Sequence, residues 1–161
     1  MKNLILVVVL IVTTAISMNA QKISPHAIGF RLGDSDGFGA EVSYQRALFD
    51  NNRLEFDLGW RGGDGWDGFK LAGLYQWVMN IDSGFNWYVG AGGGVGSYSW
   101  DNPLPNGDDG ETFIFAAGDI GIEYDFDIPL LLSLDFRPEL GFGDFSDDVD
   151  FDIALGVRYQ F

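Results

Sequence analysis

The feature that most constrains this 161-residue chain is an alternation of apolar and polar residues that recurs in eight segments after residue 20. In residues 53–62, the clearest case, leucine, phenylalanine and tryptophan alternate with arginine, glutamate and aspartate. A period of two is typical of β-strands whose two faces meet different surroundings, so the sequence predicts an all-β fold. The eight predicted strands are residues 27–33, 38–49, 53–62, 69–79, 85–96, 112–126, 130–143 and 151–161.

The distribution of charge between the two phases indicates what surrounds the strands. Arg46 is the one charged residue on the apolar phase, whereas the other phase carries nine acids and six bases. A half-exposed sheet in a soluble protein also alternates. Here, however, the apolar phase is rich in aromatic residues over eight strands, most of which reach the roughly 9–11 residues that a tilted membrane-spanning strand needs.

A sheet in a membrane must also close on itself, because unpaired backbone groups in hydrocarbon cost several kcal/mol each. We therefore predict an eight-stranded antiparallel up-and-down transmembrane β-barrel. An eight-stranded barrel has an interior just wide enough for side chains to fill, so a packed network of charged groups is expected there, with an ion path as the alternative. The predicted lumen residues are Arg31, Glu41, Arg53, Glu55, Asp57, Arg61, Lys70, Asp119, Glu123, Asp125, Asp135, Arg137, Glu139, Asp152 and Arg158.

The connections between the strands also alternate. Three are tight or simple, and the other four, 34–37, 63–68, 101–111 and 144–150, are mostly longer and hold twelve acids but no lysine or arginine. Short turns on one side and longer loops on the other are typical of outer-membrane barrels. Clustered carboxylates can bind Ca²⁺ or Mg²⁺, but no loop has the EF-hand spacing, so a rim that loosely gathers divalent cations is favoured over a dedicated site. The candidate metal ligands are Asp101, Asp108, Asp109 and Glu111.

The first twenty residues have the layout of a secretory signal peptide. A short positive start is followed by the apolar run 4–12 and by the mostly small and polar segment 13–20. Nine apolar residues are too few to span a bilayer as a helix, which needs ~20. We expect cleavage after Ala20, with cleavage after Ser17 or an uncleaved anchor as alternatives, so that residues 21–161 form the barrel domain.

Composition excludes several classes of function. The net charge of -15, without a cluster of lysine or arginine, argues against binding to nucleic acid. The absence of cysteine excludes thiol catalysis and cysteine-based metal sites, and no cofactor is expected. The single histidine, His26, lies at the start of the first predicted strand, where an interfacial polar role is favoured over catalysis. The glycine-rich run 90–96 lacks the pattern of a phosphate-binding loop and is better explained as space for bulky neighbours in the lumen.

The last predicted strand alternates to the end of the chain and finishes on a C-terminal phenylalanine, which resembles the signal read by the barrel-assembly machinery. Segment 128–140, with that strand, is also similar to small barrel-domain proteins of unknown role. Over residues 21–161 the chain thus resembles the small OmpA/OmpX-like barrels of the Gram-negative outer membrane. The resemblance implies outer-membrane lipid and the assembly machinery as partners, with Tyr159 and Phe161 as the assembly signal.

These observations favour a non-enzymatic outer-membrane protein with a structural or surface-interaction role. Its acidic loops would present the contact surface to an extracellular partner that the sequence does not name. Three alternatives are kept: a lipid-modifying outer-membrane enzyme, a small channel, and a secreted lipocalin-like barrel that binds an apolar ligand. The last of these needs the two faces reversed, with apolar residues inside and charges outside.

Overall fold

The computed structural model describes residues 23–33, 39–101, 110–142 and 149–161, and within these ranges the chain forms β-strands, turns and short connections. The predicted signal peptide, residues 1–20, lies outside them, so its cleavage stays a prediction. None of the described residues belongs to a helix long and apolar enough to cross a membrane. The strands are β1 (His26–Leu32), β2 (Ala40–Phe49), β3 (Asn52–Gly63), β4 (Trp66–Asp82), β5 (Phe85–Trp100), β6 (Gly110–Asp125), β7 (Leu130–Phe142) and β8 (Val149–Gln160).

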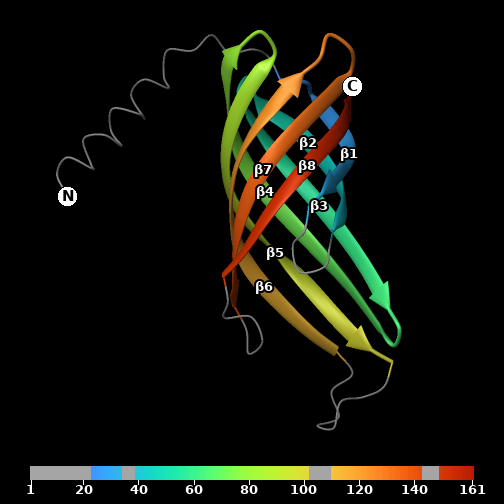
Figure 1. The fold of residues 1–161 in the computed structure, drawn as a ribbon. Helices are drawn as coiled ribbons and strands as arrows, with labels where there is room; N and C mark the ends of the chain where they lie inside the picture. Colours follow the sequence, from blue (N-terminus) through green and yellow to red (C-terminus); the bar gives the residue numbers. More distant parts are fainter. Residues whose placement is uncertain (1–22, 34–38, 102–109, 143–148) are drawn as a thin grey trace, which may run out of the picture.

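The strands form a closed antiparallel barrel in the order of the chain (Figure 1). Each strand pairs with the next, and β1 pairs with β8 over the register Ala27↔Gln160 to Leu32↔Leu155. In the closed part of the wall each strand is therefore paired on both sides, as a β-structure in hydrocarbon requires. The predicted eight-stranded antiparallel up-and-down barrel is therefore confirmed.

The two faces of the barrel wall have opposite chemistry. Among the described residues, the outward phase exposes large apolar side chains on every strand, with exposed fractions as high as 60% for Phe30 and 74% for Trp60. The inward phase buries most of the charged groups, among them Arg31, Asp57 and Arg137. A secreted lipocalin-like barrel would need the reverse arrangement, so that alternative is wrong.

The two ends of the barrel differ in their connections. One end, which we call the turn end, carries three short connections, residues 50–51, 83–84 and 126–129, together with the C-terminus. At Ser83 and Gly84 the φ angles are 44° and 91°, and two successive left-handed residues are typical of a tight hairpin turn. At the opposite end, the loop end, which is at the bottom of Figure 1, β1, β3, β5 and β7 end and β2, β4, β6 and β8 begin.

At the loop end the strands β3, β4, β5 and β6 continue beyond the rest of the barrel wall (Figure 1). Residues 63–68, predicted as a loop, instead extend both strands of a hairpin, and only residues 64–65 connect β3 to β4. Gly65, with φ at 85°, allows this tight connection, and the ladder continues through Gly63↔Trp66 and Trp66↔Trp100. We call residues 61–68, 97–100 and 110–113 the overhang.

Candidate functional site: the barrel lumen and its two ends

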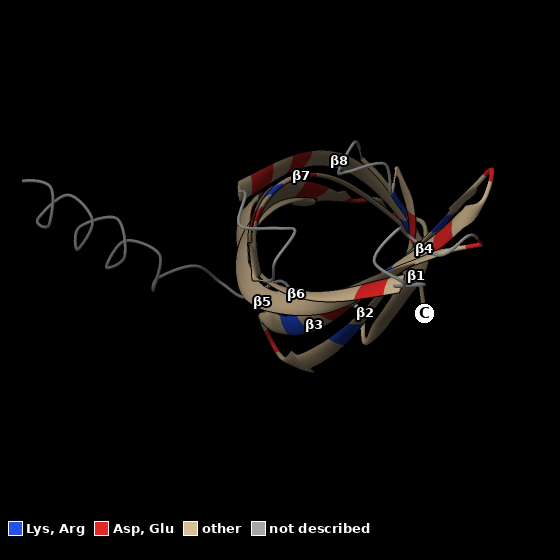
Figure 2. Cartoon of the chain, turned by 90° about the horizontal axis from the view of Figure 1, so that it is seen from below, with Lys and Arg blue, Asp and Glu red and all other residues tan. Residues whose placement is uncertain are grey.

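Thirteen of the fifteen predicted lumen residues are buried inside the barrel, where they face one another across its axis. Seen from the loop end, acidic and basic positions occur on several sides of the ring (Figure 2). The thirteen are Arg31, Glu41, Arg53, Glu55, Asp57, Lys70, Asp119, Glu123, Asp135, Arg137, Glu139, Asp152 and Arg158.

Arg31 on β1 links four strands. Its Nη1 donates to Glu41 on β2 at 3.0 Å and to Asp152 on β8 at 2.5 Å. Its Nε donates to Asp135 on β7 at 3.0 Å, and its Nη2 contacts the same carboxylate. The planar guanidinium has five donors in a fixed fork, so one arginine can hold several carboxylates at once.

Arg137 and Arg158 link the opposite sides of the ring. The Nη2 of Arg137, on β7, donates to Glu55 at 3.0 Å and to Asp57 at 2.7 Å, both on β3. The Nη2 of Arg158, on β8, donates to the second oxygen of Glu55 at 3.1 Å. Its other nitrogens donate to Ser43 and Ser133 at 2.9 and 2.8 Å. Glu55 thus lies between two guanidinium groups from separate strands.

The remaining two buried cations lie nearer the ends. Toward the turn end, the Nη2 of Arg53 lies 2.7 Å from Glu123, and its Nε donates to Gln76 at 2.6 Å. Toward the loop end, the ammonium of Lys70 lies 2.5 Å from the carboxylate of Glu139. Each of the five buried cations therefore joins strands that are not adjacent in the wall, and the lumen is cross-linked along its length.

Carboxylates outnumber cations in this network by eight to five among the described residues. Five of the carboxylates have one oxygen without a hydrogen bond in the described structure, of which that of Glu123 still lies 2.7 Å from the Nη2 of Arg53: Asp57, Asp119, Glu123, Asp135 and Glu139. Buried polar groups of this kind are usually satisfied by ordered water. The lumen is thus a polar, acid-rich interior.

Arg61 and Asp125 do not join the buried network. Arg61 is exposed because it lies on the overhang, where β3 continues past the closed part of the barrel. Its guanidinium packs 5.7 Å from the centre of the Trp66 ring. Asp125 is half-buried because it is the last residue of β6, at the turn end. The alternation predicts that both residues are on the inward phase. It does not predict how far along the barrel axis a residue lies, and therefore not whether the wall encloses it.

An apolar lining on the inward phase of β4 and β6 was missed at the sequence level. Ala72 and Leu74 pack there against Phe115 and Ala117. In β5, where the phase was ambiguous, Tyr88 faces inward and is fully buried. The glycine-rich run of β5 does make room for lumen rings, as predicted, because a Cβ at Gly94 would collide with the Phe115 ring.

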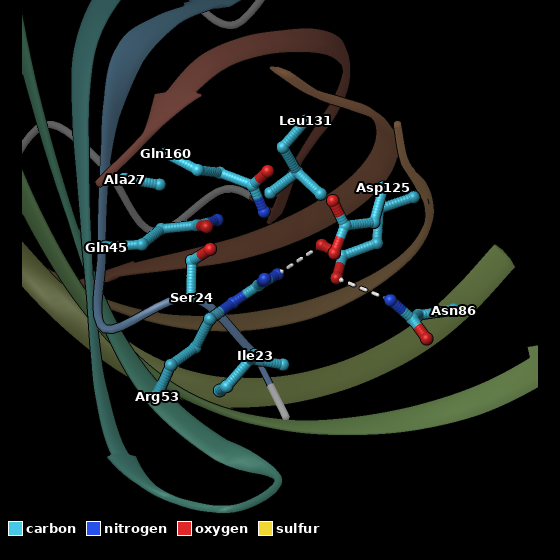
Figure 3. A pocket seen from close by; sticks show the side chains of 10 residues that line it. Ile23, Ser24, Ala27, Gln45, Arg53, Asn86, Asp125, Leu131 and Gln160 are labelled. Atoms are coloured by element: carbon cyan, nitrogen blue, oxygen red, sulfur yellow. Dashed lines mark hydrogen bonds and ion pairs between the residues drawn. The ribbon is translucent and has the colours of Figure 1, made fainter. Parts of the chain in front are cut away.

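At the turn end the segment before β1 lies across the mouth of the lumen. Ile23 is 8% exposed and packs against Val78 and Tyr88, and the amide of Ala47 donates to Pro25 at 2.9 Å. Figure 3 shows Ile23 and Ser24 beside Arg53. The cavity that remains has a volume of about 10 Å³, the space of a single water molecule.

The acidic loop end provides no assembled metal site in the described ranges. Asp101 follows β5 and Glu111 lies on β6, whereas Asp108 and Asp109 fall outside the described residues. Across the described chain, no group of three or more histidine or carboxylate side chains is arranged to hold a metal ion. The two described candidates are thus not gathered into a site.

His26 and the C-terminal residue lie together at the turn end. The Nδ1 of His26 is 2.8 Å from the hydroxyl of Tyr44, and its ring stacks on Phe161 with centroids 5.4 Å apart. The backbones of His26 and Phe161 exchange hydrogen bonds of 3.2 and 2.9 Å. These contacts give the histidine a structural role where the first and last strands meet.

Known proteins resemble the chain in fold and not in sequence. No model of a known protein family matches the sequence, and no curated protein matches it. Solved structures do match over most of the chain, and three of them illustrate the likeness. The N-terminal β-barrel domain of Pseudomonas aeruginosa OprF has a TM-score of 0.65 at 16% identity, covering 84% of this chain and 96% of that chain.

Two further structures are similar to the chain at the same level of identity. Neisserial surface protein A matches with a TM-score of 0.56 at 16% identity, covering 84% of this chain and 94% of that one. Ail, the attachment invasion locus protein of Yersinia pestis, has a TM-score of 0.57 at 17% identity, covering 86% and 97%. At this identity the likeness concerns the fold alone: the chain has the fold of the small eight-stranded outer-membrane β-barrels.

Proposed function

We propose that the protein is an integral outer-membrane protein without enzymatic activity, which acts as a structural element or as a surface for interaction. The observation that carries this proposal is the outward face of the closed barrel. It exposes large apolar side chains on all eight strands of the described chain, whereas soluble monomers rarely expose large contiguous apolar patches. Such a face is stable in hydrocarbon and would aggregate in water.

The arrangement of the connections supports an orientation. The loop end, which carries the acidic connections, would face the outside of the cell, and the turn end with the C-terminus would face the periplasm. The loop end is then the surface for contact with other molecules, and its carboxylates would gather divalent cations only loosely. Tyr159 and Phe161 would serve as the assembly signal at the opposite end.

The experiment that tests the location is membrane fractionation followed by gel electrophoresis of heated and unheated samples. We expect recovery with the outer membrane and a band that shifts on heating, because a closed barrel resists detergent until it is boiled. A soluble periplasmic protein without a heat-dependent shift would refute the proposal.

Single cysteines test the orientation, since the natural chain has none. Asp64→Cys at the loop end is expected to react with a membrane-impermeant maleimide on intact cells. Asn51→Cys, in a turn at the other end, is the matched control and should react only after the outer membrane is opened. The reverse pattern of labelling would invert the assignment of the two ends.

The alternative of a lipid-modifying enzyme depends on His26, the single histidine of the chain. Its contacts with Tyr44 and Phe161 favour a structural role. Cells with and without the protein are therefore expected to have identical lipid profiles. A lipid species that is present in wild-type cells would establish the enzyme if it were absent both from cells without the gene and from cells with a His26→Ala variant of normal abundance.

A further inference from the structure

The overhang reverses the polarity of the barrel wall. In the closed part of the wall apolar side chains point outward and charged ones point inward, whereas on the overhang the large aromatic side chains take the inward phase and small polar ones the outward phase. A wall with a polar outer face no longer suits hydrocarbon, so the overhang projects beyond the apolar band into water. Its outward side chains are Asp67, Ser97, Ser99 and Thr112, and its inward phase carries Arg61, Trp66, Tyr98, Trp100, Glu111 and Phe113.

The inward rings of the overhang form a row that leads into the lumen. The ring centroids lie 6.0 Å apart between Trp66 and Tyr98, 5.6 Å between Tyr98 and Phe113, and 6.2 Å between Phe113 and Phe115. The first three rings are only half-buried, whereas Phe115 is buried. We call these four residues the aromatic row.

Each ring of the aromatic row lies over a glycine of the neighbouring strand, where a Cβ would collide with the ring. A Cβ on Gly68 would come within 2.8 Å of the Tyr98 ring, and a Cβ on each of the other three glycines would come at least as close to its own ring. The row is therefore fixed by the backbone spacing of the wall and is not a chance contact of loose side chains. The pairs are Gly63 with Trp66, Gly68 with Tyr98, Gly96 with Phe113, and Gly94 with Phe115.

Both ends of the aromatic row already bind a cation of the chain itself. The guanidinium of Arg61 lies 5.7 Å from the centre of the Trp66 ring, and the ammonium of Lys70 lies 5.0 Å from that of Phe115. Rings attract cations through the negative potential of their faces. The row thus combines apolar area with sites at which guanidinium and ammonium groups are stable.

The charge around the row is predominantly negative. Glu111 and Asp64 belong to the overhang and Asp101 follows it directly, whereas Asp67 points outward; Arg61 is the one cation on the described residues of the overhang. Glu111 is paired with Tyr98 in the register of β5 and β6, so it shares the inward face. A partner that complements this surface carries positive charge on an apolar body.

We propose that the inner face of the overhang docks a basic amphipathic peptide segment of a partner protein. Arginine or lysine side chains of the segment would lie against Glu111 and the ring faces, while its apolar side chains would cover Trp66 and Trp100. Aromatic residues that are half-exposed on a rigid element are the usual anchors of protein interfaces. This inference rests on the proposed function, because it requires the loop end to face the outside.

The test uses the full-length mature protein in nanodiscs of zwitterionic lipid, with empty nanodiscs as a background control. The probe is a fluorescein-labelled twelve-residue peptide in which arginine and leucine alternate, and the matched peptide has glutamate for arginine. We expect the basic peptide to bind, its affinity to fall with salt, and the acidic peptide not to bind. Neutral oligosaccharides such as cellotetraose serve as the probe for a carbohydrate site.

Two variants locate the binding on the overhang. Trp66→Ala is expected to weaken binding by about tenfold, as for an interface anchor. Trp60→Ala, on the outward face of the same hairpin, is the matched control and should change the affinity less than about twofold. Glu111→Gln, which leaves every ring in place, should weaken binding at low salt but not at high salt, so it tests the proposal even if the tryptophan variant fails to fold.

Several outcomes would overturn the proposal. They are an equal loss of affinity for the basic peptide in Trp66→Ala and Trp60→Ala, equal binding of the two peptides, or binding of the oligosaccharide in place of the basic peptide. A protein that shifts on heating but binds no peptide would refute only this inference. A protein absent from the outer membrane would refute the proposed function as well, so the two failures are distinguishable.

Discussion

At the scale of single residues, Arg137 is the clearest point at which the lumen network can be broken. It is fully buried, and its guanidinium holds Glu55 at 3.0 Å and Asp57 at 2.7 Å. We predict that Arg137→Met lowers the free energy of unfolding by about 3–5 kcal/mol, because two buried carboxylates then lose a partner. Urea unfolding in lipid vesicles, followed by tryptophan fluorescence, measures the change.

Arg61→Met is the matched control for this prediction, because Arg61 is exposed on the overhang. A change within about 1 kcal/mol is expected there, as for other exposed charges. In the Arg137→Met background, Asp57→Asn should recover part of the loss, since it removes one of the uncompensated charges. If Arg137→Met lowered the free energy of unfolding as little as Arg61→Met, the network would contribute little to stability.

The sequence alone could place most charged side chains on the inward phase, but it could not say which of them meet. Alternation fixes the face of the wall and not the distance across the lumen, which depends on how the closed sheet staggers its strands. For this reason the partners of Arg31 on β2, β7 and β8 could not be foreseen. For the same reason Arg61 was wrongly placed among the lumen charges.

At the scale of strands, the end of β8 tests the proposed assembly signal. Phe161 stacks on His26 and exchanges two backbone hydrogen bonds with it, yet its ring is 59% exposed. We predict that Phe161→Ser lowers the amount of folded protein in the outer membrane several-fold, because the residue would be read during assembly, while the unfolding midpoint of the folded fraction changes little. Heat-shift gels of membrane fractions measure the first quantity, and urea titration measures the second.

Phe151→Ser is the matched control in the same strand, because Phe151 is also an exposed outward ring, 65% accessible, at the other end of β8. It should leave the amount of folded protein nearly unchanged. If both variants lowered the amount equally, the loss would come from the apolar band as a whole. The C-terminal residue would then have no special role in assembly.

The strands themselves could be predicted to within a few residues, because alternation interrupted by turn residues marks them directly. The exceptions lie where that signal is weak. Residues 63–68, rich in glycine and aspartate, were interpreted as a loop, although Trp66 continues the ladder of β4 opposite Trp100. In β5 the run of glycines leaves the phase ambiguous in the sequence, and the buried side chains of Asn86 and Tyr88 show which face points inward.

At the scale of the whole molecule, the network determines whether ions can cross the barrel. Guanidinium groups from β1, β3, β7 and β8 reach across the lumen, and Ile23 lies over its turn end. An eight-stranded barrel whose interior is filled by side chains has no continuous aqueous path. We therefore predict that the wild-type protein shows no steady conductance in planar lipid bilayers, in preparations that shift fully on heating.

A variant with a partly emptied lumen separates a filled barrel from one that never inserted. Replacing Glu55 and Arg158 together by alanine removes one acid and one base that contact each other, at 3.1 Å, near the middle of the network. Seven carboxylates and four cations then remain of the eight and five in the described lumen, so the space that opens is still acidic. We predict a small conductance that prefers cations, which is measured as the reversal potential in a salt gradient. Steady conductance of the wild type would refute the filled lumen, and an anion-selective variant would refute the acid excess, because the sign of the fixed charge in a narrow pore decides which ions enter.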